Sequence, residues 1–218
     1  MHDLEVIRLG RIGYRPCMEM MERRVADRAR DGVPDCLFLL EHDPVLTLGR
    51  RAKVENVLAT PDRLAAQGIE LVESGRGGDV TYHGPGQIVG YPVMDLRPDR
   101  KDVRRYVADL EEVMIRVCAR HGVEAGRVEG HTGTWVDAER KVGAIGVRIS
   151  RWITSHGFAL NVSTGLDPFS LIVPCGIRGK AVTSLTEETG TPLSVEQVLS
   201  DVEDVFIRVF GDRSSVGT

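Results

Sequence analysis

The sequence predicts an α+β fold rather than a doubly wound α/β fold. Segments towards both ends of the chain have helical periodicity, whereas the middle of the chain alternates short apolar stretches with glycines. Neither a GxGxxG motif after a strand nor a GxxxxGK[ST] loop occurs, and the segment 176–180 has the wrong spacing for one. The pattern therefore indicates helices packed on a β-rich centre, without a dinucleotide or nucleoside triphosphate site.

The N-terminal quarter reads as strand, helix, strand. Residues 4–9 and 36–41 are short apolar runs typical of strands, and the second is apolar enough to be buried. Between them, residues 17–30 place cysteine, methionine and valine at helical spacing, and Gly32 follows as a terminator.

Three further helices carry end signals. Thr60 and Pro61 open a short helix that Gly68 closes. Apolar residues at helical spacing predict a long helix over 101–121, ended by Gly122. The last helix opens at Ser194 with Gln197 three residues later, which is the capping-box pattern.

The central segments 69–93 and 133–162 read as strands and tight turns. Gly84, Pro85 and Gly86 force a turn, after which Gln87, Val89, Tyr91 and Val93 alternate on one strand face.

Composition places limits on the class of protein. The 218 residues are 42% hydrophobic and 28% charged with a net charge of −4, as expected for one globular domain over 1–211 with a flexible tail at 212–218. This balance excludes a bulk polycationic nucleic-acid binder. No apolar stretch is long enough for a membrane span, and no signal peptide is visible, so we expect a cytoplasmic protein.

The cysteines and histidines do not suggest a metal site. Cys17, Cys36, Cys118 and Cys175 form no CxxC pair and are too scattered for a disulfide framework. The histidines at 42, 83, 131 and 156 form no HxH or HxxxH pair, so most are expected to be hydrogen-bonded structural groups. His83 is the exception, because glycines surround it.

The segment 76–87, RGGDVTYHGPGQ, is the densest candidate for binding. Its adjacent glycines allow close approach of backbone N–H groups to a carbonyl or carboxylate, and Arg76 and His83 add polar groups. The alternative is a β-hairpin whose glycines serve only its turns.

Cys175 and Lys141 are the candidates for chemistry. Cys175 follows an apolar run at a turn flanked by proline and glycine, whereas the other cysteines lie within predicted elements. Strand parity puts Lys141 on the apolar face of Ile145, Val147 and Ile149, where loss of solvation favours a neutral amine suited to proton transfer. The alternatives are a core cysteine and a surface lysine whose ammonium reaches water.

These segments resemble the lipoyl(octanoyl) transferases, also called lipoate-protein ligase B. The resemblance rests on the following segments, which agree in order and spacing over nearly the whole chain: Arg76–Pro92, Glu41–Arg50, Lys141–Val147, His156–Asn161 and Pro174–Ile177.

The resemblance implies a mixed sheet flanked by helices, similar to the biotin and lipoate protein ligases. It implies that an octanoyl group rests as a thioester on Cys175, that Lys141 acts as general acid and base, and that no cofactor is used. The segments implied to line the acyl site are Arg76, Gly77, Gly78, Asp79, Val80, Thr81, Tyr82 and His83, then Ala144, Ile145 and Gly146, then Gly157, Phe158 and Ala159.

The implied reaction needs no ATP, because thioester exchange is near thermoneutral and amide formation from a thioester is downhill. The donor would be octanoyl-acyl-carrier protein. The acceptors would be lipoyl domains of 2-oxoacid dehydrogenase complexes and the glycine cleavage H protein, and the enzyme would be a monomer. Backbone N–H groups near Gly78, Gly146 or Gly176 could hold the oxyanion. Ile145, Val147, Tyr91 and Phe158 are expected as cavity walls, and Arg148, Arg151, Arg178 and Lys180 as a docking patch.

The same residues allow three alternative functions. An ATP-dependent lipoate or biotin ligase would form an acyl-adenylate and would not need Cys175. A thioesterase would pass the acyl group to water. A non-enzymatic acyl-carrier-binding module would make Lys141 and Cys175 bystanders.

Overall fold

The computed structural model describes residues 4–30, 32–176 and 179–211, and of Cys175 it describes only the backbone. The predicted tail 212–218 and Arg178 of the predicted docking patch lie outside the described residues. The helices are α1 (Tyr14–Arg28), α2 (Pro61–Ala66), α3 (Val103–Arg120), α4 (Leu185–Thr189) and α5 (Val195–Gly211), with 3-10 turns η1 (Val54–Asn56), η2 (Asp167–Leu171) and η3 (Pro174–Gly176).

A large mixed sheet forms the centre of the molecule, in the order β1-β2-β6-β10-β9-β8-β7, with β11 added beside β9. β1 pairs with β2 and β11 with β9 in parallel, and the other pairs are antiparallel. Its strands are β1 (Leu4–Ile12), β2 (Asp35–His42), β6 (Gln87–Val93), β7 (Gly126–Val128), β8 (His131–Val136), β9 (Arg140–Ser150), β10 (Ile153–Asn161) and β11 (Ala181–Val182). The predicted α+β class with a mixed sheet is confirmed.

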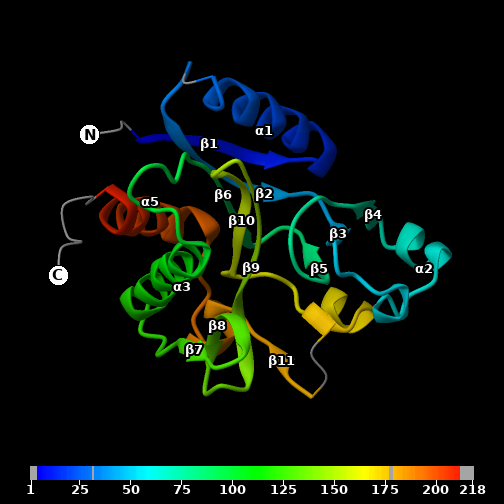
Figure 1. Ribbon diagram of the computed structural model, residues 1–218. Coiled ribbons are helices and arrows are strands. Elements are labelled where there is room, and N and C mark those ends of the chain that lie inside the picture. Colours follow the sequence, from blue (N-terminus) through cyan, green and yellow to red (C-terminus); the bar gives the residue numbers. More distant parts are fainter. Residues whose placement is uncertain (1–3, 31, 177–178, 212–218) are drawn as a thin grey trace.

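One face of this sheet is covered by the long helices α3 and α5, which lie together beside the central strands (Figure 1). Alternate strand residues such as Leu39, Ile88 and Leu160 pack there against Leu110 and Phe206, all nearly inaccessible to solvent. This face is the main apolar core.

The opposite face is shared by α1 and a second, smaller sheet (Figure 1). α1 packs Cys17 and Met21 against Phe38, Tyr91 and other residues of β2 and β6. The small sheet has the order β4-β3-β5, made of β3 (Val45–Leu48), β4 (Glu70–Glu73) and β5 (Val80–His83). Its outer residues Val80 and Tyr82 pack against Phe169 of η2, so its inner residues are turned towards the large sheet.

The turn after His83 connects two sheets rather than two strands of one hairpin. Gln87 N–H donates to Gly84 O at 3.2 Å, which closes the predicted turn. However, β5 pairs with β3 in the small sheet, whereas β6 pairs with β2 and β10 in the large one. The hairpin alternative for the glycine-rich segment is therefore wrong.

The helix signals in the sequence agree with the structure to within a few residues. Ser194 and Gln197 form the predicted capping box, since Gln197 N–H donates to Ser194 Oγ and Ser194 N–H donates to Gln197 Oε1. Thr60 Oγ1 likewise accepts from Arg63 N–H at the start of α2. Among the described helices, none is both long and apolar enough to cross a bilayer.

Candidate active site

A cavity of about 370 Å³ lies between the inner face of the small sheet and the large sheet. Eleven of the fourteen residues predicted to bind the acyl group line it, together with Lys141. They are Arg76, Gly78, Asp79, Thr81 and His83 on the small-sheet side, and Ala144, Ile145, Gly146, Gly157, Phe158 and Ala159 on the large-sheet side.

Small residues form the large-sheet wall of this cavity. Ala144 lies directly opposite Ala159 in the β9–β10 ladder, and Gly146 lies opposite Gly157. A Cβ atom at Gly146 would lie only 3.0 Å from the Cδ atom of Arg76, so the two sheets approach closely there. Cross-strand pairs without large side chains leave a narrow space that suits an unbranched apolar chain.

Lys141 is buried at 7% exposure and lines the same cavity. Its Nζ atom lies 4.9 Å from the centroid of the Trp135 ring on the neighbouring strand β8. Gly133 has a positive φ of 123°, and a Cβ atom there would lie 2.5 Å from the Lys141 Cε atom. Glycine at 133 therefore makes room for the lysine side chain, and the alternative of a surface lysine is wrong.

A β-bulge turns Lys141 towards the cavity. Thr134 pairs with Gly143 but the next residue, Trp135, pairs with Lys141, so β9 contains one residue more than β8 here. The extra residue, Val142, packs on the helix-covered face.

The predicted face of Lys141 is consequently wrong. Val147 and Ile149 pack against the apolar cluster under α3 and α5 and do not line the cavity, and Ile145 packs there while also bordering the cavity. Lys141 and Ala144 line the cavity. Parity counting assumes an uninterrupted alternation, and the bulge breaks it.

Arg76 closes the small-sheet side of the cavity and is buried at 7% exposure. Its Nε and Nη2 atoms donate to Thr47 Oγ1 at 3.0 and 2.8 Å, and its Nη1 atom donates to Gly77 O at 3.0 Å. These hydrogen bonds hold the guanidinium against β3 and fix the glycine-rich segment beside the cavity.

Asp79 joins the cavity wall to the turn that contains Cys175. Its Oδ1 atom accepts from Val80 N–H at 2.7 Å, and its Oδ2 atom accepts from Asn56 Nδ2 at 2.6 Å. A Cβ atom at Gly176 would lie 2.6 Å from Asp79 Oδ2, so η3 packs directly on this carboxylate.

Cys175 is placed only through its backbone, because its side chain lies outside the described residues. Pro174, immediately before it, lines a small second cavity together with Lys141, Thr81 and Ala144. The peptide N–H of Thr183 also donates to Lys141 O at 2.9 Å. The turn η3 and Lys141 therefore border one common space.

Three predicted binding residues do not line the cavity. Val80 and Tyr82 point to the opposite side of β5, where they pack in the outer cluster of the small sheet. Gly77 uses its N–H to donate to Val147 O at 2.9 Å. Of the predicted walls, Ile145 and Phe158 border the cavity although they also pack on the helix-covered face, whereas Val147 does not line it and was predicted wrongly.

Four cavity residues were not predicted: Arg51, Gly130, His131 and Thr132. The last three lie in and after the turn between β7 and β8, and no sequence motif connects that turn to the glycine-rich segment. Arg51 lies directly after the matched segment 41–50. Its position next to that matched segment is a signal that could have placed it at the site. In the structure, the backbone of this loop is hydrogen-bonded to the glycine-rich segment.

Two buried neutral histidines lie at the cavity: His83 is part of its lining, and His42 bonds to the lining residue Tyr91. Burial lowers the pKa of His42 to about 4 and that of His83 to about 3. His42 Nδ1 donates to Ile12 O at 2.9 Å, so its Nε2 accepts from the Tyr91 hydroxyl, also at 2.9 Å. Tyr91 itself lines the cavity, as predicted.

A chain of hydrogen bonds connects the two sheets below the cavity. His83 Nδ1 donates to Gln87 Oε1 at 2.6 Å, and Gln87 Nε2 donates to Asn161 Oδ1 at 2.8 Å. Asn161 Nδ2 then donates to Thr183 O at 2.9 Å. Because each group is buried and partnered, this chain fixes the positions of β5, β6 and β10 relative to one another.

The other three cysteines are buried and unlinked. Burial raises the pKa of the Cys17 and Cys118 thiols to about 12 and that of Cys36 to about 11. Their thiolates are therefore scarce at neutral pH, and their role as small apolar core residues is confirmed.

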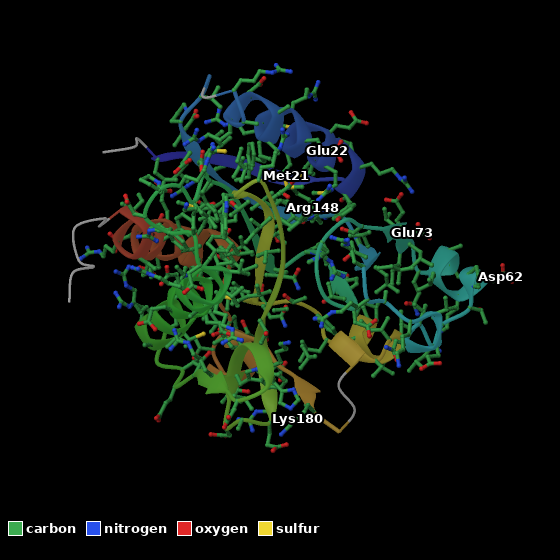
Figure 2. The ribbon with its side chains drawn as sticks, viewed as in Figure 1. Met21, Glu22, Asp62, Glu73, Arg148 and Lys180 are labelled. Carbon is green, nitrogen blue, oxygen red and sulfur yellow. The ribbon has the colours of Figure 1, made fainter. Side chains whose placement is uncertain are left out.

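The predicted docking patch does not form one surface. Figure 2 shows Arg148 beside Met21 and Glu22 of α1 and Glu73 of β4, with Lys180 at the other end of the molecule. Lys180 Nζ is bound to Ala138 O and Glu139 Oε1, next to the first residues of β9. Arg140 and Arg148 are eight positions apart along the extended strand β9, roughly 26 Å. Residues that are close in the sequence are therefore far apart in space here.

The cavity thus combines a buried amine, a narrow wall of small residues and fixed polar groups. Among the residues that the structure describes, no group of three or more His, Cys, Asp and Glu side chains is placed to hold a metal ion. This arrangement can move a proton within a space shaped for an apolar chain.

The chain matches known proteins over most of its length. The family model described as "Lipoyl protein ligase A/B catalytic domain" matches residues 13–207. This chain belongs to that family. An octanoyltransferase of Myxococcus xanthus is 49% identical over 96% of this chain and 60% of its own length, and one of Koribacter versatilis is 48% identical over 96% and 85%.

Solved structures support the fold at much lower identity. The bipartite lipoate protein ligase of Thermoplasma acidophilum matches with a TM-score of 0.77 and 17% identity, over 97% of this chain and 85% of its own. A biotin protein ligase of Aquifex aeolicus matches with a TM-score of 0.53 and 11% identity, over 97% and 70%. The expected fold, the expected family and its octanoyltransferase activity are confirmed.

Proposed function

We propose that this protein transfers an octanoyl group from octanoyl-acyl-carrier protein to a specific lysine of lipoyl domains through a thioester on Cys175. The observation that carries the proposal is Lys141, a buried lysine turned by a β-bulge into a narrow cavity beside the turn that contains Cys175. The octanoyltransferases among the relatives support the same reaction class.

In the first half-reaction the Cys175 thiol loses its proton to the amine of Lys141 and attacks the carrier thioester. The bond from the acyl carbon to the Cys175 sulfur forms as the bond to the carrier sulfur breaks, and Lys141 returns the proton to the departing carrier thiol. In the second, the acceptor amine attacks the enzyme thioester and loses its proton through Lys141, while Cys175 leaves as a thiol.

The small-residue wall would hold the hydrocarbon chain. Ala144, Ala159, Gly146 and Gly157 form two adjacent cross-strand pairs, and Phe158 lies between them in sequence. The apolar chain would lie along these pairs, with its thioester end towards Lys141.

Backbone N–H groups would stabilise the tetrahedral oxyanion, an effect of about 3 kcal/mol per donor. The N–H of Gly176 already donates to Val173 O at 3.0 Å. This leaves Gly78 and Gly146 as the better candidates of the three expected from the sequence, since both line the cavity.

The test is mass spectrometry of the protein mixed with octanoyl-acyl-carrier protein alone. We expect a gain of one octanoyl group that maps to Cys175, is absent from Cys175→Ala and Lys141→Ala, and is retained in the controls Cys118→Ala and Lys180→Ala. Addition of a lipoyl domain should then move the group to the acceptor lysine. A protein that never gains the octanoyl group contradicts the thioester mechanism.

The same mixture distinguishes the remaining functions. Acyl transfer by Cys175→Ala with ATP and free octanoate would indicate an ATP-dependent ligase, and octanoate released without acceptor would indicate a thioesterase. Tight carrier binding without transfer would indicate a binding module. Gel filtration tests the proposed monomer, and fractionation of cells tests the proposed cytoplasmic location.

A further inference from the structure

The segment 49–58 lies between the cavity wall and the turn of Cys175. Arg50 N–H donates to Arg76 O at 3.0 Å, and Arg51 N–H donates to Gly78 O at 3.1 Å. On its other side, Val173 N–H donates to Asn56 O, and Leu58 N–H donates to Leu171 O, both at 2.8 Å. We call residues 49–58 the rim segment, because these bonds place it at the edge of the cavity.

The rim segment exposes apolar side chains. In the described part of the chain five large apolar side chains are exposed, and two of them lie in this segment: Val54, the first residue of η1, at 86% and Leu58, just after η1, at 59%. Val54 and Leu58 are four residues apart in a segment whose backbone joins the cavity wall to the turn of Cys175. Such exposed apolar side chains can supply the apolar part of a contact with another protein.

The rim segment also carries positive charge. Arg50, Arg51 and Lys53 are exposed within four residues, and Arg51 lines the cavity itself. Lys53 pairs with Glu55 at 3.8 Å, but both side chains are about 70% exposed, so the pair is weak. A surface that combines apolar side chains with cations is complementary to an acidic surface of another protein that also carries apolar side chains.

We propose that the rim segment docks the acyl donor, a carrier protein with an acidic surface that presents octanoyl thioester on an extended arm. The proposal rests on the function proposed above. The positive charge of the rim segment favours docking of the donor over docking of the acceptor. The acceptor must bring a lysine ammonium past these cations, whereas the donor brings an uncharged thioester. Docking here places the arm beside the cavity edge formed by Arg51.

The experiment measures octanoyl transfer with the purified full chain and the variant Arg50→Glu/Lys53→Glu. We expect kcat/KM for octanoyl-acyl-carrier protein to fall at least about tenfold through KM, with a flatter dependence on salt. The KM for the lipoyl domain and the rate with octanoyl-N-acetylcysteamine, which has no carrier surface, should not change. The matched control is Arg23→Glu/Arg104→Glu, which makes the same change of charge on α1 and α3.

A second variant tests the apolar contact. Val54→Asp should raise KM for the carrier in the same direction, and Ile207→Asp, an exposed apolar residue on α5, should not. Carrier kinetics equal to those of the control variants overturn the docking surface, as does a change of KM for the lipoyl domain alone. Failure of the wild-type protein to transfer from either donor is a different result, because it contradicts the proposed function itself.

Discussion

The two faces of the large sheet are built from alternate residues of the same strands, yet they differ in kind. The face under α3 and α5 is mainly apolar, with Phe206 stacked on Phe210 at 4.3 Å between ring centroids. The face towards the small sheet encloses a cavity with a buried arginine, lysine and histidine, Arg76, Lys141 and His83. The helix-covered face therefore stabilises the fold. This stability offsets the free-energy cost of keeping polar groups away from water on the cavity face.

The largest expected effect is on the apolar face. Phe206→Ala should lower the free energy of unfolding by about 3–5 kcal/mol, because it empties a fully buried position. The acyl-chain preference of the folded fraction should not change. Urea denaturation checks this, with the partly exposed neighbour Ile207→Ala as control. Equal losses in both variants would show that the core is not concentrated on this face.

The second effect is a pH dependence that belongs to the cavity face. The pKa values of His42, His83 and His156 are lowered by burial to about 4, 3 and 3, below the 6.5 of an unfolded chain. Between these values the unfolded state binds more protons, so stability is complete above about pH 6.5 and falls as the pH decreases towards 4.

His42→Gln measures one histidine's share of this dependence. It should remove about 1.4 kcal/mol per pH unit from the slope between pH 4.5 and 6, or about 3 kcal/mol over the whole shift of the His42 pKa. Denaturation at a series of pH values checks it. An unaltered slope would mean that His42 does not resist protonation in the folded protein.

Much of the difference between the two faces of the large sheet could not be predicted from the sequence. Helical periodicity predicted α3 and α5, and the glycine-rich signature predicted most of the cavity wall, because both are local patterns. The side of β9 that carries Lys141 was not predicted, since it depends on one extra residue relative to β8. His131 was missed because only the packing of two distant turns brings it to the cavity.

A smaller effect should appear in acyl-chain selection. Ala144→Val adds two methyl groups to the cavity wall opposite Ala159, so transfer of octanoyl relative to hexanoyl should fall about tenfold. Competition between the two thioesters measures the ratio. Ile149→Val, on the helix-covered face of the same strand, is the control, and an identical ratio in both variants would argue against this wall as the chain site.

The smallest effect should come from the capping box of α5. Ser194→Ala removes the oxygen that accepts from Gln197 N–H, and should lower the free energy of unfolding by about 1 kcal/mol. Thermal denaturation detects a change of this size, and transfer kinetics should remain at the wild-type level. Altered kinetics would show that the helix-covered face is coupled to the cavity.

The extra residue in β9 suggests how such a site could arise within a stable sheet. Inserting one residue into a strand reverses the orientation of everything on one side of the insertion without changing any side chain. In β9 the extra residue is Val142, and because of it the amine of Lys141 faces the cavity in place of an apolar side chain. The rest of β9 keeps its contacts with α3 and α5. A change in strand length, rather than a new residue, is then sufficient to introduce reactivity into an existing fold.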